Sequence, residues 1–233
     1  AASVTVRDRS SVAGRARVTG SATFPVRLAH GDTFIVSVDR GSNLTATFNA
    51  YARRLTSSGG TYTAVTAGHK LVLSVGGVLR EVAFTGSENS ADLFAAAVNV
   101  GIPGVYADVS SGNLRVTTDK KGTGAALSVH ASTDTDVLAS IGFTSGQASS
   151  SLGSSNVADI EAVTAAEFET VVEGAVTGSA AGADADGHPY VESTTTGSGS
   201  YVQVINTSTA DDEFGFGNAE VQGASVGVNT LAF

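Results

Sequence analysis

The chain of 233 residues contains no cysteine, no methionine and no tryptophan, and only three prolines. Without cysteine, disulfide bonds, thiolate metal sites and cysteine nucleophiles are all excluded. No run of about 18 apolar residues occurs, so we expect no membrane span. Cysteine-based chemistry and a membrane-embedded role are therefore not expected.

Charged residues are also scarce, at 15% of the chain, whereas Gly, Ala, Ser, Thr and Val dominate. This composition favours a β-rich chain with many turns, and the 42% of hydrophobic residues can fill a core. We predict a β-rich α+β fold, built from repeated small modules of β-hairpins with one helix each, plus an extended N-terminal arm.

The charges are unevenly distributed. Residues 1–54 carry eight arginines and three acids, whereas residues 144–233 carry twelve acids and no lysine or arginine. The net charge of -9 argues against nucleic acid as a partner. Opposite charges at the two ends favour attraction between copies, although the acids could equally serve only to keep the surface soluble. We predict an assembly arm that docks on an acidic neighbour, such as the C-terminal module of another copy, through Arg7, Arg9, Arg15 and Arg17.

Parts of the sequence repeat. Residues 31–41 (GDTFIVSVDRG) match residues 68–78 (GHKLVLSVGGV), and both predict a strand that enters a hairpin. Residues 91–99 match residues 165–173, and both have the apolar spacing of a helix. Asn89 or Ser90 is a candidate cap for the first helix, and the T-x-x-E sequence at Thr164 predicts a capping box for the second.

The stretch DKKGTG, residues 119–124, has the glycines and lysines that a phosphate-binding loop would use. It lies within a third repeat, in which residues 115–133 match residues 191–209. The counterpart of DKKGTG there is TTTGSG, which keeps the glycines and loses both lysines. Because a turn needs only the glycines, we interpret DKKGTG as a turn between strands.

The repeats predict five segments along the chain. In the complete module, we expect a helix followed by a hairpin to which residues 126–130 add a further strand. The segments are a basic N-terminal arm (1–30), a β-hairpin half-module (31–66), a complete β-α-β module (67–143), a Ser/Gly linker or loop (144–156) and a second β-α-β module with an acidic C-terminal tail (157–233).

The sequence ADADGH, residues 183–188, places Asp184 and Asp186 near a histidine. A calcium loop of the EF-hand type would need Gly where Pro189 stands and Glu where Thr195 stands. We interpret the stretch as a solvated turn, with weak Ca²⁺ binding by the two aspartates as the alternative. The sequence shows no catalytic or cofactor-binding constellation, so we predict that the protein is not an enzyme and needs no cofactor.

The run GHKLVLSVGG…REVAFTG…SADLFAAAVN…GVYADVSSGNLRVTTDKKGTGAALSV resembles the flagellin hook IN motif. In that family a hairpin is followed by AAxIN, then VxAxV, then G-x-L-x-x-T/S and a glycine turn. Ala97-Val98-Asn99 stands in the place of IN, residues 107–109 in the second and residues 112–118 in the third. The modules are also similar to those in structural proteins of tailed bacteriophages. The resemblance implies an extracellular-type structural module and carries no functional residues with it.

We therefore predict a non-enzymatic structural protein of a phage particle, in its tail, fibre or capsid surface. It would self-assemble through its β-modules and N-terminal arm. The expected partners are copies of itself, other virion structural proteins and a host surface glycan, and the expected location is the virion, assembled in the cytoplasm of a bacterial host. The alternatives are a host- or glycan-binding adhesin module and a subunit of a bacterial surface or flagellar-type appendage.

Overall fold

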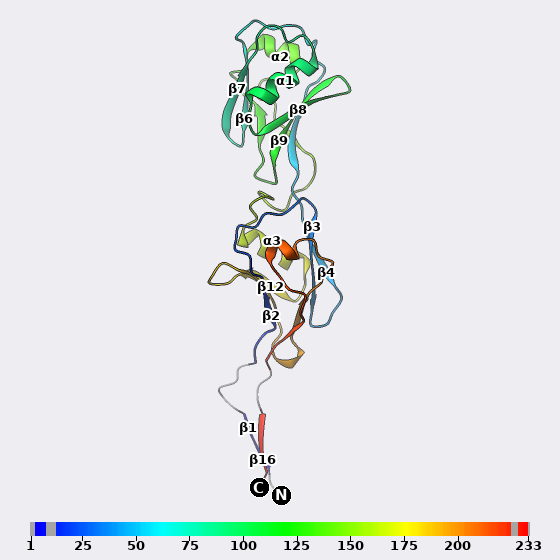
Figure 1. Ribbon diagram of the computed structural model, residues 1–233, viewed down its shortest axis with the longest axis vertical. Coiled ribbons are helices and arrows are strands. Elements are labelled where there is room, and N and C mark those ends of the chain that lie inside the picture. Colours follow the sequence, from blue (N-terminus) through cyan, green and yellow to red (C-terminus); the bar gives the residue numbers. More distant parts are fainter. Residues whose placement is uncertain (1–2, 8–12, 225–227, 233) are drawn as a thin grey trace. The chain divides into compact units, whose positions relative to one another are not determined.

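The computed structural model describes residues 3–7, 13–224 and 228–232, and the side chains of residues 13–224. It confirms a β-rich α+β fold with small antiparallel sheets (Figure 1), and this described part contains four short α-helices. None of these helices is long and apolar enough to cross a membrane. The chain forms two compact units, which we call the split unit (residues 1–48 and 160–233) and the inserted unit (residues 49–159).

The split unit combines the two ends of the chain. Its strands form a three-stranded sheet in the order β12-β13-β2, a four-stranded sheet in the order β15-β14-β3-β4 and a two-stranded ribbon of β1 and β16, which lie side by side in Figure 1. Its elements are β1 (Ser3–Arg7), β2 (Arg17–Thr19), β3 (Asp32–Val38), β4 (Leu44–Phe48), α3 (Ala165–Ala175), β12 (Ser179–Ala183), β13 (Pro189–Ser193), η1 (Gly197–Gly199), β14 (Tyr201–Val204), α4 (Asp211–Phe214), β15 (Val221–Gln222) and β16 (Val228–Ala232).

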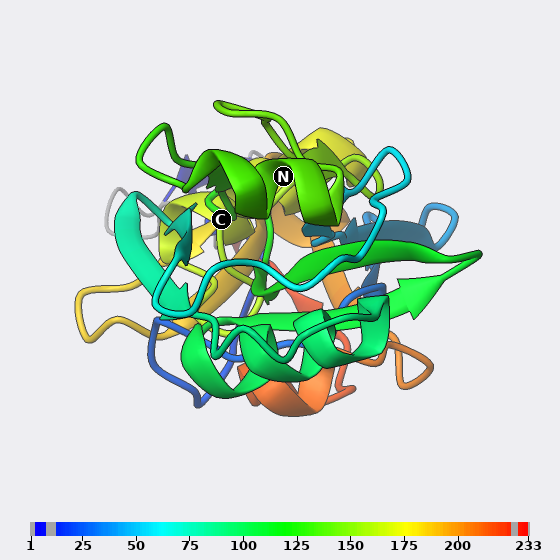
Figure 2. The same cartoon turned by 90° about the horizontal axis from the view of Figure 1, so that it is seen from above.

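The inserted unit has a three-stranded sheet in the order β10-β6-β7 and a four-stranded sheet in the order β11-β5-β9-β8. Its helix α1 packs against β8 and β9 and lies along a strand in Figure 2. The elements are β5 (Ala52–Thr56), β6 (Lys70–Val75), β7 (Val78–Ala83), α1 (Ala91–Gly101), β8 (Val105–Ser110), β9 (Asn113–Lys121), β10 (Leu127–Val129), α2 (Thr135–Ile141) and β11 (Ser150–Ser151).

Six strands of each unit follow the same order. Sheet β10-β6-β7 corresponds to β14-β3-β4, and strands β8-β9-β5 correspond to β12-β13-β2. The register agrees as well, since Leu71 lies opposite Val82 in one hairpin and Phe34 opposite Ala46 in the other. The sequence repeats are therefore repeats of a whole unit. In the sequence, the inserted unit lies between β4 and α3 of the split unit.

This arrangement differs from the predicted order of modules. Residues 31–66 are divided between the units after Phe48, because the hairpin of β3 and β4 is completed by α3 and β14 from the far end of the chain. One strand prediction was wrong: β10 joins β6 rather than the β8–β9 hairpin, because the third strand beside β9 is β5.

Matching hydrogen bonds hold the equivalent strands. Thr133 Oγ1 accepts from the Val72 N–H and donates to the Val72 carbonyl, both at 3.0 Å. Ser208 Oγ accepts from the Ile35 N–H at 2.8 Å and donates to the Ile35 carbonyl at 3.4 Å. In each unit, one hydroxyl thus bonds to both backbone groups of a strand residue. It attaches the loop after β10 to β6 in the inserted unit, and the loop after β14 to β3 in the split unit.

The helices begin and pack as the sequence predicts. The Ser90 side chain caps α1 by accepting from the Leu93 N–H, and Thr164 forms the expected capping box with Glu167 on α3. Each helix has a stripe of apolar residues that faces the core and is buried. This core stripe contains Phe94 and Val98 on α1, and Phe168 and Val172 at the equivalent positions of α3. Burial of this stripe ties each helix to its sheets.

The cores differ in composition. The split unit packs phenylalanine rings against one another, with centroids 4.7 to 6.4 Å apart: Phe24, Phe34, Phe48, Phe168, Phe214 and Phe216. The inserted unit uses more aliphatic side chains, including Leu71, Leu73, Leu114 and Ile141, around the ring pair of Phe84 and Phe94 at 4.9 Å.

Residues 13–30, predicted as part of an arm, pair and pack within the split unit. Strand β2 pairs with β13, and Val26 bridges to Val163. Val18, Val26 and Leu28 are buried, so this segment contributes to the core of the unit.

Candidate functional sites

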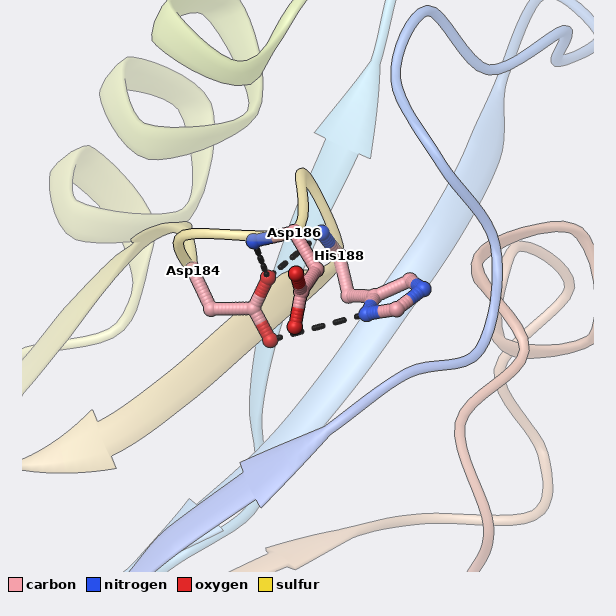
Figure 3. Close-up of side chains that lie close together, drawn as sticks. All are labelled: Asp184, Asp186 and His188. Carbon is pink, nitrogen blue, oxygen red and sulfur yellow. Dashed lines mark hydrogen bonds and ion pairs between the residues drawn. The ribbon is translucent and has the colours of Figure 1, made fainter.

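The loop between β12 and β13 brings Asp184, Asp186 and His188 together (Figure 3). Each offers one ligand atom, and these atoms all lie within 4.8 Å of one another. The grouping arises because Gly187 adopts a φ of 84° and closes a tight turn, in which the Asp184 N–H donates to the His188 carbonyl at 2.9 Å. His188 thus joins the two aspartates that the sequence singled out.

The Asp184 carboxylate is engaged by its own loop. Its Oδ1 accepts from the backbone N–H groups of Asp186 at 3.0 Å and His188 at 2.8 Å, and its Oδ2 lies 3.6 Å from His188 Nδ1. The bond from the His188 backbone is the main reason that the pKa of Asp184 lies below its ordinary value. Three partly exposed side chains supply fewer ligands than the roughly six to eight that Ca²⁺ takes. The arrangement stabilises a turn in the way that Asx side chains ordinarily do.

The predicted assembly arginines are placed as follows. Arg15 Nη1 lies 2.8 Å and Arg17 Nη2 2.9 Å from the carboxylate oxygens of Glu192, and the Arg17 guanidinium stacks 3.8 Å from the centre of the Tyr190 ring. Arg7 lies in β1, where its backbone pairs with β16, and Arg9 lies outside the described residues.

Burial acts to raise the pKa of Glu192, but the hydrogen bonds from Arg15 and Arg17 outweigh it, so the pKa of this carboxyl lies below its ordinary value. The acidic partner of these two arginines is therefore a residue of the same chain. The two ion pairs join the N-terminal and C-terminal parts of the split unit.

His69 and Asp136 form a pair that the sequence did not predict. His69 Nδ1 lies 2.7 Å from Asp136 Oδ1, although the residues are 67 positions apart in the chain. The hydrogen bond that the His69 imidazole donates to the Asp136 carboxylate raises the pKa of His69. Asp136 also accepts from the N–H groups of Thr66 at 3.1 Å and Val137 at 2.8 Å, so the pair ties the loop before β6 to the start of α2. Local sequence offers no signal for a contact that only the fold creates.

The first three residues of the DKKGTG stretch, 119–121, end β9, and residues 122–124 form the turn that follows it. The N–H groups of Gly122, Thr123 and Gly124 donate to the carbonyls of Tyr51, Val157 and Ala158, at 3.0, 2.8 and 3.0 Å. Lys120 Nζ pairs with Asp159 at 3.1 Å. Because the amides already bond to carbonyl oxygens, they are not available to hold a phosphate.

An apolar surface was also missed. Among the residues with described side chains, the large hydrophobic side chains that stay substantially exposed all belong to the inserted unit: Val78, Leu79, Leu93, Val100, Tyr106 and Leu152. A groove of about 470 Å³ lies between α1 and β7, with Val82, Leu93, Ala97 and Val100 in its lining. The signal was present in the sequence, because α1 carries a second apolar stripe beside the one that faces the core.

No protein-family model matches this chain, and no curated protein sequence matches it either. Among solved structures, it is similar to the D2-D3 domains of the flagellar cap protein FliD from Escherichia coli, with 13% sequence identity, a TM-score of 0.35 and coverage of 96% of this chain and 94% of that one. A structure of the D1-D2-D3 domains of E. coli FliD gives 16% identity and a TM-score of 0.39, over 96% of this chain and 57% of that one. FliD from Helicobacter pylori gives 12% identity and a TM-score of 0.29, over 94% and 85%. At TM-scores this low the likeness is coarse, and no role follows from it.

Proposed function

We propose that this protein is a non-enzymatic structural subunit that works by associating with copies of itself. The observation that carries the proposal is the confinement of exposed large apolar side chains to one unit of the described chain. Two of these side chains, Leu93 and Val100, line the groove between α1 and β7, and an exposed apolar patch often marks the place where another protein binds. The polar clusters described above, by contrast, are engaged in holding loops and strands of the same chain.

The setting that we propose is an extracellular-type assembly, either a bacterial appendage or the phage particle predicted from the sequence. The appendage is supported by the resemblance of residues 68–129 to the hook IN motif and by the role of its asparagine. Asn99 donates to the Ala107 carbonyl at 2.8 Å and accepts from the Ala107 N–H, so it pins β8 to the end of α1. The motif thus describes how one module is held together. Co-purification with sheared appendages, or with infectious particles, distinguishes the two settings.

The molar mass of the purified chain, measured by light scattering over a range of concentrations at low and high salt, tests the proposal. We expect a defined oligomer that persists at high salt, because the burial of apolar surface is not screened by ions. Association that disappears at high salt would instead assign assembly to the charged N-terminal and C-terminal regions. A monomer at every concentration would contradict the proposal.

A further inference from the structure

The groove between α1 and β7 is lined in part by apolar side chains that do not belong to the core. Val100 is 92% exposed and Leu93 is 46% exposed, whereas Phe94 and Val98 on the same helix are fully buried. The helix therefore has two apolar stripes, of which only one faces its own core. The outer stripe, formed by Leu93, Ala96, Ala97 and Val100, lines the groove.

The split unit provides an internal comparison for this stripe. Its helix α3 keeps the core stripe, with Phe168 and Val172 buried at the equivalent positions. At the positions of Leu93, Ala96 and Val100, however, it carries Glu167, Thr170 and Gly174. At the position of Ala97 it carries Val171, which is buried. Because the same fold forms without exposed apolar side chains at the positions of Leu93 and Val100, folding alone does not account for these two residues on α1.

Opposite charges flank the groove. Asp92 lies in the first turn of α1. The last residue of α1, Gly101, lies against Val82 of β7, since a Cβ added to Gly101 would stand 2.5 Å from Val82 Cγ2. Arg80 lies two residues before Val82 on the same face of β7, and therefore near this end of the helix. Both Asp92 and Arg80 are exposed, and neither has a partner among the described residues. The split unit has Ala166 and Leu44 at these positions and so carries neither charge.

We propose that this surface is the interface between two copies of the chain, with the two α1 helices packed antiparallel about a two-fold axis. In that arrangement Leu93 meets Val100 of the second copy, and the small side chains of Ala96 and Ala97 allow the helices to approach closely at the centre. Antiparallel packing also brings Asp92 of each copy beside Arg80 of the other. The interface therefore contains this ion pair twice, because every contact in a two-fold interface occurs in both directions. A second copy therefore matches both the apolar stripe and the charges at its ends.

This inference rests on the proposed function, for which it supplies the interface. Matched substitutions in the full-length chain test it. Val100→Glu places a charge in the stripe at a side chain that is almost wholly exposed, so the unit is expected to fold. Gly174→Glu is the control at the equivalent position of α3, where an added Cβ meets nothing within 4 Å. We expect Val100→Glu to raise the dimer dissociation constant in sedimentation equilibrium by about tenfold or more, and Gly174→Glu to leave it within about twofold of the unmodified chain.

Charge exchange tests the orientation of the helices. Asp92→Arg and Arg80→Asp should each weaken the dimer by roughly threefold or more, and the double substitution should restore it, because the paired charges are only reversed. If the unmodified chain self-associates but Val100→Glu has no effect, or if the double substitution is weaker than either single one, this interface is wrong and the proposed function stands. A chain that stays monomeric at every concentration would overturn both.

Discussion

The inserted and split units share the order of six strands, the positions of their helices and the hydroxyl groups of Thr133 and Ser208 that bond to β6 and β3, yet their cores and surfaces differ. Where the split unit packs rings, with Phe34 and Phe214, the inserted unit packs Leu71 and Ile141 at corresponding positions. The hydroxyl side chains that bond to the backbone are thus retained between the two units, whereas core positions carry apolar side chains of different shape. Backbone groups must find a partner in any version of the fold, whereas a core can be filled in more than one way.

The contact between the first hairpin and the helix shows how such an exchange is balanced. In the inserted unit Gly101 faces Val82, and a Cβ on this glycine would stand 2.5 Å from a valine methyl group. The split unit has Ala175 and Ala46 at the equivalent positions. A larger side chain on the strand is compensated by a smaller one on the helix, which keeps the local volume nearly constant.

The largest expected effect is loss of the central ring of each core. Phe168→Ala should lower the free energy of unfolding by about 5 kcal/mol and Phe94→Ala by about 3 kcal/mol. Phe168 contacts other rings on several sides, whereas Phe94 has mainly Phe84 and Tyr62. Guanidinium denaturation measures both values, and hydrogen exchange locates the loss. Equal losses of protection in both units from either substitution would show that the units do not fold separately.

The volume balance gives the next effect. Gly101→Ala should destabilise the inserted unit by about 1 to 3 kcal/mol, because the methyl group overlaps Val82, despite the better helix propensity of alanine. Adding Val82→Ala should recover at least about 1 kcal/mol of this loss in a double-mutant cycle. Ala175→Gly is the control in the split unit and should cost only about 1 kcal/mol, the ordinary propensity difference. Strict additivity of Gly101→Ala and Val82→Ala would contradict the proposed compensation.

A smaller difference is expected where each helix holds its following strand. Asn99 makes two hydrogen bonds to Ala107, whereas Glu173 accepts one from the Ala181 N–H at 3.0 Å. Asn99→Ala should therefore cost about 2 kcal/mol and Glu173→Ala about 1 kcal/mol, in proportion to the bonds removed. Thermal unfolding of the two variants measures the difference. A Glu173 variant that is the less stable of the two would show that the motif asparagine has no special role.

The smallest effects are those of pH, and they have opposite signs in the two units. The pKa of Glu192 is lowered in the folded chain, so its contribution is present above an unfolded pKa of about 4.3 and is lost as pH falls through the folded value. The pKa of His69 is raised, so its contribution is present below an unfolded pKa of about 6.5 and is lost as pH rises through the folded value.

Melting curves of the unmodified chain, Glu192→Gln and His69→Gln across this range measure both contributions. The effect of Glu192→Gln should vanish in acid, and that of His69→Gln should vanish in mild alkali. If either substitution had the same effect at every pH, the corresponding ion pair would not contribute to stability.

Much of the local structure could be predicted from sequence. The glycine hairpin at Gly76-Gly77, the Ser90 cap and the Thr164 capping box depend on residues close together in the chain, and each forms where it was expected. The match of DKKGTG to TTTGSG, which keeps the glycines but has no lysine, likewise favoured a turn over a phosphate-binding loop. Such features are governed by φ preferences and nearby hydrogen bonds, so sequence spacing describes them well.

The candidate sites could be predicted less completely. The two aspartates of the β12–β13 loop were found because they lie two residues apart, and His188 joins them through the same turn. The contact of Arg15 and Arg17 with Glu192 was not found, since sequence charge shows attraction without showing whether the partner lies in the same chain. The pair of His69 and Asp136 required two distant loops to be placed.

The sequence by itself determined that the chain is β-rich, that its pieces repeat and where its turns and helix caps lie, because these follow from local propensity and periodicity. Only the tertiary structure decided which pieces belong together. Strand β3 has the same short-range signals whether it pairs with a neighbouring segment or with β14 from the far end of the chain. Strand pairing depends on the burial of side chains from all the elements at once. That burial joins the chain segments on either side of the inserted unit into the split unit.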